Sequence, residues 1–405
     1  MILKRWLVGP ALKTTQAVHE RLSKRVALAV FSSNALSPVA YATEEILLVL
    51  VLAGTAAVSW SIPISFAIVL LVSILTISYR QIIFEYPQGG GAYTVSRANL
   101  GEWPALTAAA ALMIDYVLTV AVSVAAGVAA LTSAVPALFA HREALGSAAI
   151  LLLVIINLRG ARESGRIFAI PTYVSVGALL LMLIVGFYHM LWGEPPRAMP
   201  AHRASTSGLL EQVSFFLILR AFASGCTAVT GMEVISNGVA AFRRPESKNA
   251  AMTMVAMSVI LGILFLGISM LAYFYGVLPK EDETVVSQIA RLTFGTGMLY
   301  YLVQASTMLL LILAANSSFA GFPHLASILA HDCYMPQQMR NRGDRLVFSN
   351  GIIILGVLAG LLIVAFRGET HALIPLYAVG VFLSFTLSQT GMVRYWMSKR
   401  EGHWR

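Results

Sequence analysis

The chain has 405 residues, of which 58% are hydrophobic and only 12% are charged, and its mean hydropathy is +0.77. Soluble domains carry about 25% charged residues, so this composition excludes an ordinary water-soluble fold and makes lipid the expected solvent. The net charge of +9 does not indicate nucleic-acid binding, because the basic residues are distributed among the loops instead of gathered on one face.

Ten apolar segments are long enough to cross roughly 30 Å of hydrocarbon. We expect them at 26–53, 61–84, 103–133, 145–160, 167–192, 210–241, 249–278, 285–330, 347–366 and 371–395. The first segment is too long for a cleavable signal peptide, so we expect it to be retained as a helix. The eighth segment is long, and its end from Pro323 onward is a candidate interfacial segment.

The basic residues predict how these segments are oriented. Of the 28 Lys and Arg residues, 21 fall in loops on the side of the N-terminus, six fall on the opposite side, and Arg220 lies within a segment. Because basic loops remain in the cytosol, the N-terminus is expected to be cytosolic. The predicted organisation is a basic cytosolic N-terminus (1–25), a first half (26–192), an extracellular loop (193–209), a second half (210–395) and a cytosolic tail (396–405).

The first segment is interrupted by polar residues. Ser32, Ser33, Asn34 and Ser37 precede Pro38, which removes a backbone donor and clashes with the preceding helical turn. We therefore expect the helix to unwind near residues 34–38, where freed carbonyl groups can face a cation. The alternative is a simple proline kink whose freed carbonyls are satisfied by serine hydroxyls.

The sixth segment is interrupted in the same way. Gly225 and Gly231 permit unwinding and a close approach of the backbone. Thr227, Thr230 and Glu233 are spaced by three, which places them on one helical face if this part stays wound. An ionisable residue near the middle of a membrane indicates a functional site, although a structural ion pair of Glu233 with a basic residue is the alternative.

The third segment carries a polar stripe. Asp115, Thr119 and Ser123 recur every four residues, so they share one face, and that face is costly to expose to lipid. The stripe is expected to face a cavity, or alternatively to join neighbouring helices by hydrogen bonds. Glu44 and Glu45 follow the first interruption, and because adjacent helical residues point about 100° apart, at most one of them is expected to face the cavity.

Two interrupted helices at matching positions of two five-segment halves are typical of secondary transporters. Five is an odd number, so the second half begins on the opposite side of the membrane and the halves are expected to be inverted repeats. An enzyme is not expected, because no Ser/His/Asp arrangement and no metal-ligand spacing is present. Cys226 and Cys333 give no disulfide framework.

Five stretches, in order over nearly the whole chain, carry a resemblance to a known family: Phe31-Ser-Ser-Asn-Ala-Leu-Ser-Pro-Val-Ala-Tyr-Ala-Thr-Glu-Glu45, Tyr86-Pro-Gln-Gly-Gly-Gly-Ala-Tyr93, Gly225-Cys-Thr-Ala-Val-Thr-Gly-Met-Glu-Val-Ile-Ser-Asn-Gly238, Leu313-Ala-Ala-Asn-Ser-Ser-Phe-Ala-Gly-Phe-Pro323 and Phe348-Ser-Asn-Gly351. In these stretches the chain resembles the amino acid–polyamine–organocation (APC) superfamily. Within it, the chain is most similar to potassium importers of the KimA type, near relatives of the KUP family.

The resemblance implies an all-α membrane protein with a LeuT-like 5+5 inverted-repeat bundle and discontinuous first and sixth transmembrane helices. It also implies proton-coupled uptake, and it assigns substrate-site roles to Tyr41, Asp115, Thr119, Thr230 and Glu233. The family has twelve spans and often a cytosolic C-terminal domain, so a chain ending after its tenth span looks truncated.

Three residues depart from the family pattern. Asn34 and Gly321 stand where the family is expected to have Asp, and Pro38 stands where it is expected to have Ser. Loss of a carboxylate at Asn34 would weaken the binding of a cation.

The residues near the two interruptions favour a monovalent cation as the substrate. The first interruption lacks the glycine-rich backbone with which amino-acid carriers of the superfamily hold a carboxylate, since no glycine occurs between Val26 and Gly54. Asp115 and Glu233 instead offer carboxylates, and oxygen ligands suit a cation that must exchange its hydration shell. A proton-coupled amino-acid permease is the alternative, and a membrane scaffold or sensor without transport activity is a third interpretation.

The resulting hypothesis is potassium uptake by alternating access. The substrate-binding set is Asn34, Tyr41, Asp115, Thr119, Thr227, Thr230 and Glu233, with potassium held by Tyr41, Asp115, Thr119 and Thr230. Asp115 or Glu233 is expected to carry the coupled proton, because burial favours the neutral form of a carboxyl group.

The expected setting is the plasma (inner) membrane, which the chain crosses several times. The expected partners are the lipid bilayer and a small cation or amino acid, with no nucleic acid and no cofactor. The oligomeric state is open, and a homodimer is one alternative.

Overall fold

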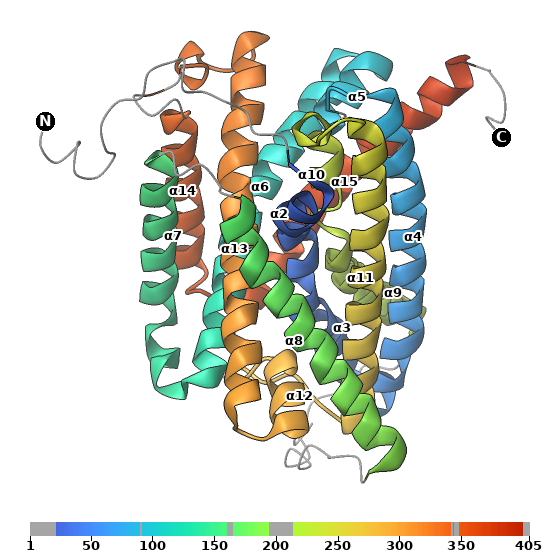
Figure 1. The fold of residues 1–405 in the computed structure, drawn as a ribbon, viewed down its shortest axis with the longest axis vertical. Helices are drawn as coiled ribbons and strands as arrows, with labels where there is room; N and C mark the ends of the chain where they lie inside the picture. Colours follow the sequence, from blue (N-terminus) through green and yellow to red (C-terminus); the bar gives the residue numbers. More distant parts are fainter. Residues whose placement is uncertain are drawn as a thin grey trace, which may run out of the picture.

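The computed structural model describes residues 22–89, 91–159, 165–193, 214–341, 343 and 348–399. Most of the predicted N-terminal region (1–25), loop (193–209) and tail (396–405) lies outside these residues. Within the described residues the regular structure is helical, apart from one isolated bridge between Leu22 and Phe242. The long helices form an elongated bundle (Figure 1). The prediction of an all-α protein is confirmed.

The first half of the chain folds into ten helical elements: α2 (Lys24–Leu36), η2 (Ser37–Ala40), α3 (Ala42–Val51), η3 (Thr55–Trp60), α4 (Ser61–Glu85), α5 (Ala92–Asn99), α6 (Glu102–Ala134), η4 (Pro136–His141), α7 (Arg142–Leu158) and α8 (Gly165–Trp192). The η elements are 3-10 turns. Helix α6 packs along α13 and α15 of the second half, and most of its apolar length is buried.

The second half repeats this order: α9 (Phe215–Gly225), η5 (Cys226–Val229), α10 (Glu233–Asn237), η6 (Val239–Ala241), α11 (Glu246–Tyr275), α12 (Val285–Phe294), α13 (Met298–His331), η7 (Gln337–Met339), α14 (Ser349–Ala365) and α15 (Thr370–Lys399). Each half thus has a broken helix, a long helix, a short helix, a helix of 33 or 34 residues, a 3-10 turn and two further helices. The element order repeats although no sequence identity between the halves is obvious.

The two broken helices run in opposite directions. The chain just before α2 pairs with the chain just after η6, since the N–H of Leu22 donates to the carbonyl of Ala241 (2.8 Å) and the N–H of Arg243 donates to the carbonyl of Leu22 (3.0 Å). The start of the first broken helix therefore lies beside the end of the second. The short helices α5 and α12, which occupy equivalent positions in the two halves, lie at opposite ends of the bundle (Figure 1).

The expected eighth segment, 285–330, is two helices. The chain turns between α12 and α13 at Gly295, whose φ of +68° is a conformation that glycine adopts without strain. The residues after Pro323 extend α13 to His331. The sequence did not indicate this break, because the turn is only a few residues long and lies between two apolar helices.

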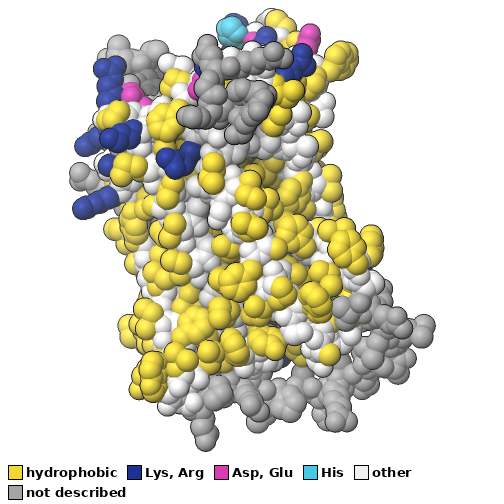
Figure 2. Space-filling model, turned by 90° about the vertical axis from the view of Figure 1, so that its right-hand side faces the viewer, with side chains coloured by type: hydrophobic (Ala, Val, Ile, Leu, Met, Phe, Trp, Pro, Cys, Tyr) yellow, Lys and Arg dark blue, Asp and Glu magenta, His cyan; other side chains and the backbone are white. Residues whose placement is uncertain are grey.

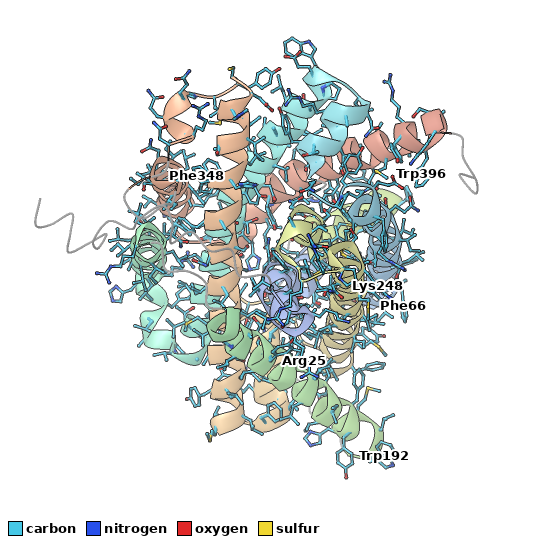
Figure 3. The ribbon with its side chains drawn as sticks, turned by 45° about the horizontal axis from the view of Figure 1, so that its top comes forward. Arg25, Phe66, Trp192, Lys248, Phe348 and Trp396 are labelled. Atoms are coloured by element: carbon cyan, nitrogen blue, oxygen red, sulfur yellow. The ribbon has the colours of Figure 1, made fainter. Side chains whose placement is uncertain are left out.

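The outer surface of the bundle suits lipid. Nine helical stretches among the described residues are long and apolar enough to cross a membrane, and α14 is a shorter apolar helix. Phe66 on α4 and Trp192 at the end of α8 point away from the bundle (Figure 3) and are 53% and 76% exposed. Figure 2 shows hydrophobic side chains along the length of the bundle, whereas Lys and Arg side chains gather near one end of this face.

Candidate functional site

The first broken helix is interrupted at residues 37–41, which overlap the end of the expected stretch 34–38, while residues 34–36 stay helical. Helix α2 ends before Ser37, Pro38 lies in the first turn of η2, and Tyr41 (φ −134°, ψ −21°) separates η2 from α3. The Ser37 hydroxyl donates to the carbonyl of Asn34 (2.8 Å). The helix is therefore interrupted, as expected for unwinding. One of its freed carbonyl groups accepts a hydrogen bond from a serine hydroxyl, as expected for a proline kink.

The second broken helix unwinds more fully. Thr230 is extended (ψ 150°) and Gly231 has a φ of +78°, before α10 begins at Glu233. The condition that would place Thr227, Thr230 and Glu233 on one helical face is therefore not met. The Thr227 hydroxyl donates to the carbonyl of Ser224 (2.9 Å) and serves its own segment.

The second interruption touches the last turn of α2 at Gly231. A Cβ atom at this position would lie 2.9 Å from the backbone nitrogen of Ala35 and 2.9 Å from the carbonyl carbon of Asn34. Real Cβ contacts of this length are essentially absent from proteins. Glycine is therefore required for the unwound part of the second broken helix to approach the last turn of α2 this closely, and the approach brings Asn34 to the site.

Five hydroxyl groups from separate parts of the chain gather beside this contact. Tyr41 lies beside the hydroxyls of Ser37 and Thr230. Tyr377 on α15 lies beside Thr230 and accepts a hydrogen bond from the Thr119 hydroxyl on α6 (3.3 Å). The predicted residues Tyr41, Thr119 and Thr230 are therefore brought together, and Tyr377 joins them.

Two buried carboxyl groups complete the cluster. Asp115 and Glu233 are each only 4% exposed, and Asp115 lies beside Thr119 and interacts electrostatically with Glu233. Among the described residues, Asp115 Oδ1, Glu233 Oε2 and Asn34 Oδ1 are buried without a hydrogen-bond partner. Buried oxygens normally have a hydrogen-bond partner. The oxygens without one, from α2, α6 and α10, therefore mark a place suited to a ligand that binds to oxygen atoms.

The structure thus links five of the seven predicted residues through a chain of neighbours: Tyr41, Asp115, Thr119, Thr230 and Glu233. Asn34 borders them through Gly231, and Thr227 is buried with its hydroxyl used locally. Ser123 is also buried (1% exposed), so the polar stripe of α6 faces the protein interior along its length. We name the linked residues together with Tyr377 the central cluster.

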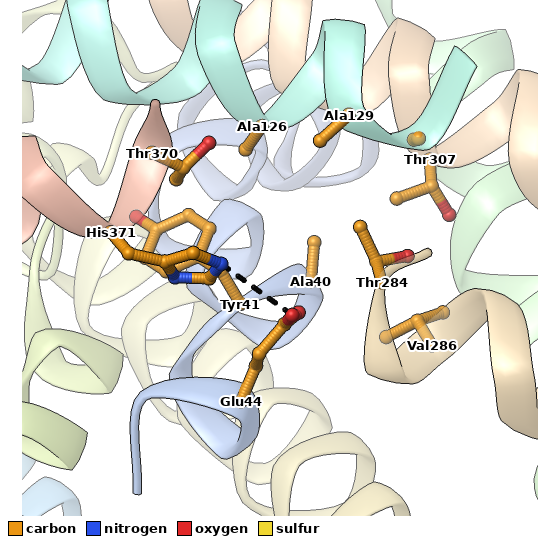
Figure 4. Close-up of a pocket in the computed structure, with 11 residues that line it drawn as sticks. Ala40, Tyr41, Glu44, Ala126, Ala129, Thr284, Val286, Thr307, Thr370 and His371 are labelled. Carbon is orange, nitrogen blue, oxygen red and sulfur yellow. Dashed lines mark ion pairs between the residues drawn. The ribbon is translucent and has the colours of Figure 1, made fainter. Parts of the chain in front are cut away.

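A cavity leads from one end of the bundle toward the central cluster. The outer cavity has a volume of about 260 Å³ and is lined by α3, α6, the segment from Lys280 to Thr284 and the start of α15. A second cavity of about 20 Å³ lies beside Tyr41 (Figure 4). The two cavities share five lining residues, so they adjoin: Glu44, Ala129, Thr284, Thr370 and His371. We call the outer cavity the vestibule.

The opposite end of the bundle is held together by polar contacts. The Tyr93 hydroxyl on α5 donates to Asp332 Oδ2 after α13 (2.7 Å), and Arg97 forms an ion pair with the same carboxylate. Partial burial, together with the hydrogen bond to Asp332, raises the pKa of Tyr93 to about 12. Helix α5 is therefore tied to the end of α13 on the side away from the vestibule.

His371 and its two carboxylate partners are the main feature that sequence analysis missed. His371 Nδ1 lies 2.5 Å from Glu45 Oε1, and His371 Nε2 lies 3.5 Å from Glu44 Oε1. Both glutamates therefore contact His371, and of the two Glu44 alone lines the cavities described above, as expected for adjacent helical residues. The signal available in the sequence was an ionisable residue at the start of an apolar segment, but its partners are more than 320 residues away.

Comparisons with known proteins agree with this architecture. The potassium transporter KimA of Bacillus subtilis (strain 168) is 51% identical over 402 residues, which cover 99% of this chain and 66% of KimA. Cationic amino acid transporter 6, chloroplastic, of Arabidopsis thaliana is 26% identical over 142 residues, covering 31% of this chain and 24% of that protein. The chain therefore spans just under two thirds of the length of KimA and a smaller share of the plant protein.

The fold is also found in a solved structure. A Na⁺-coupled sialic acid symporter in a substrate-bound outward-open state matches with a TM-score of 0.52 and 14% identity, over 94% of this chain and 81% of the symporter. The predicted LeuT-like fold is thereby confirmed, while nearness to the KUP family stays a prediction. The family model described as amino acid permease matches residues 24–405, and the chain therefore belongs to the amino acid permease family within the APC superfamily.

Proposed function

We propose that this protein is a secondary active transporter that takes up potassium together with protons by alternating access. The observation that carries the proposal is the 51% identity to the potassium transporter KimA across 99% of this chain. The unpaired buried oxygens at the contact of the two broken helices support it. Membership of a permease family favours a transporter over an enzyme.

Potassium would bind within the central cluster. Tyr41, Thr119 and Thr230 supply hydroxyl oxygens, and Asp115 supplies a carboxylate with one unpaired oxygen. Oxygens of this kind replace the hydration shell of a monovalent cation. Tyr377 adds a further hydroxyl, which the sequence analysis had not assigned.

The coupled proton would be carried by Asp115 or Glu233. Two interacting carboxylates, each 4% exposed, are costly to keep charged at the same time inside a membrane protein. A cation and a proton together relieve this cost better than either alone. A bundle that changes conformation only when both carboxylates are compensated carries the cation and the proton across together, which is what cotransport requires.

The vestibule would be the extracellular entrance. It opens at the end of the bundle that carries α12, and the loop charges predict that end to be extracellular. The contacts among Tyr93, Arg97 and Asp332 would then close the cytosolic side. The protein would lie in the plasma membrane with its N-terminus in the cytosol.

A proton-coupled amino-acid permease is the second candidate. The likeness to Cationic amino acid transporter 6 over 142 residues favours it. The cavity beside Tyr41, at about 20 Å³, has room for about one water-sized particle, which fits a single ion better than an amino acid in this conformation.

The proposal is tested in a bacterium that lacks its own potassium uptake systems. Expression of the chain should restore growth at low potassium and should produce rubidium uptake that excess potassium suppresses. Uptake of labelled lysine and alanine is measured in the same cells. Amino-acid uptake without rubidium uptake, with the protein present in the membrane, would replace the proposal by the second candidate.

A further inference from the structure

A three-residue cluster stands between the vestibule and the central cluster. His371 lies in the first turn of α15, and Glu44 and Glu45 lie in the first turn of α3. The imidazole is 41% exposed, whereas the side chains of Glu44 and Glu45 are 3% and 7% exposed. Glu44 and His371 line both the vestibule and the cavity beside Tyr41, and Figure 4 shows their ion pair within that cavity.

A neutral histidine carries one proton too few to donate to both of the carboxylates that face it in this cluster. Each ring nitrogen of His371 faces a carboxylate oxygen, at 2.5 Å for Glu45 and 3.5 Å for Glu44. A neutral imidazole has only one N–H donor, and ionised carboxylates only accept hydrogen bonds. An imidazolium satisfies both glutamates, as does a protonated carboxyl group, so the arrangement holds one exchangeable proton.

The same cluster joins three helices, α3, α12 and α15, on the vestibule side of Tyr41. Besides its contact with His371, Glu44 accepts a hydrogen bond from the backbone N–H of Val285 at the start of α12 (3.2 Å). The outer half of the first broken helix is thereby connected to α15 and to α12. Loss of the proton would leave two buried carboxylates facing an uncharged ring, and that destabilises the junction.

We propose that His371, Glu44 and Glu45 form a proton-binding latch at the vestibule, which takes up a proton from the vestibule water and, when protonated, holds α15 and α12 against α3. This proton site is separate from Asp115 and Glu233. The inference rests on the proposed function in one respect: the latch would set how uptake depends on extracellular pH. Its proton is bound by a ring nitrogen or a carboxylate oxygen and is released to water, so no other reactant is needed.

Several charged side chains of the vestibule wall are paired with one another, and His371 is the exposed ionisable group of the latch. In the vestibule wall, Arg142 of α7 pairs with Glu369 (2.7 Å), and Glu283 pairs with Arg291 of α12 (2.7 Å). Helix α6 lines the vestibule with residues that do not titrate near neutral pH. The remaining charged residues of the wall lie in the segment before α12: Lys280, Glu281 and Asp282.

The test compares two substitutions at His371. As free side chains, histidine titrates near pH 6.5 and glutamate near pH 4.3. His371→Gln therefore removes the group with the higher reference pKa, and the pH profile of rubidium uptake should shift to lower pH by about one unit or more. His371→Lys supplies a charge that persists to about pH 10, so the profile should shift to higher pH. His189→Gln, a histidine near the end of α8 outside both cavities, should keep the wild-type profile.

A second readout does not need transport. The thermal midpoint of the purified protein should fall as pH rises through the range in which the latch releases its proton, and His371→Lys should abolish this fall. Unchanged uptake and unfolding profiles in both His371 variants would overturn the latch. Equal loss of uptake in both variants, with thermal midpoints as pH-dependent as the wild type, would also overturn it. A wild-type protein that moves no rubidium but shows the predicted unfolding profile would contradict the proposed function and leave the latch supported.

Discussion

Gly231 in the second broken helix lies directly against Asn34 in the first, so close that a Cβ atom at position 231 would be 2.9 Å from the carbonyl carbon of Asn34. The contact joins the unwound part of the second broken helix to the last turn of α2, just before the first helix is interrupted. A movement of one broken helix therefore displaces the other, which is a mechanical requirement for rocking one part of the bundle against the rest.

Substitution of Gly231 by alanine should separate the two interruptions. We expect Gly231→Ala to lower rubidium uptake at least about tenfold, because overpacking a well-packed interior costs about 1–3 kcal/mol. The measurement is initial uptake rate, normalised to the amount of protein in the membrane.

Gly276→Ala is the matched control for this experiment. Gly276 also has a positive φ (+65°), but no atom lies within 4 Å of the position that a Cβ atom would take there. The strain of an alanine at positive φ, about 1–2 kcal/mol, is therefore common to both variants, and the contact with Asn34 is not. Equal uptake by the two variants would show that the close approach is unimportant.

Asp115→Asn should remove most of the uptake. Asp115 is 4% exposed and has an unpaired oxygen beside Thr119, and an interaction with a charged group is worth about 1.5–3 kcal/mol. We expect at least about a tenfold loss of rubidium uptake. Ser123→Ala, two turns further along the same buried face of α6, should retain near-normal uptake; a comparable loss in both variants would assign the whole face to helix packing.

Tyr377→Phe should weaken binding of the cation more than it slows transport. The substitution removes the hydroxyl that accepts a hydrogen bond from Thr119 (3.3 Å), and a neutral hydrogen bond contributes about 0.5–1.5 kcal/mol. The expected result is an increase of about 2- to 10-fold in the KM for rubidium with little change in maximal rate. The control is Tyr188→Phe on the exposed side of α8, and a KM equal to that of this control would remove Tyr377 from the binding site.

Asn34→Asp should strengthen cation binding. Asn34 Oδ1 is buried and lacks a hydrogen-bond partner within the described part of the chain, and a carboxylate at this position would offer a stronger ligand to a cation than an amide. We expect a lower KM for rubidium than in the wild type. A higher KM would mean that repulsion from Asp115 and Glu233 outweighs the added attraction.

Much of the fold could be predicted because membrane spans leave a local signal in the sequence. Pro38 and Gly231 located both interruptions, since proline and glycine act on their own backbone. The turn at Gly295 was missed because it is short and lies between two apolar helices. Thr230 and Glu233 do not share the expected helical face, because that prediction assumed helical geometry across a segment that is extended at Thr230.

The contacts across the bundle could not be read from spacing. His371 is separated from Glu45 by 326 residues, and Tyr377 is separated from Thr119 by 258. Only the packing of α15 against α3 and α6 brings these side chains together. A polar residue in an apolar segment could be identified as costly to expose, but its partner depends on tertiary structure.

The most direct test of the account uses the purified protein in liposomes that contain a pH-sensitive dye. Under an acid-outside pH gradient, external rubidium should enter the liposomes and speed acidification of the interior, and Glu233→Gln should abolish this coupled acidification. Rubidium entry without acidification, or acidification that follows an added amino acid and ignores rubidium, would contradict proton-coupled potassium uptake.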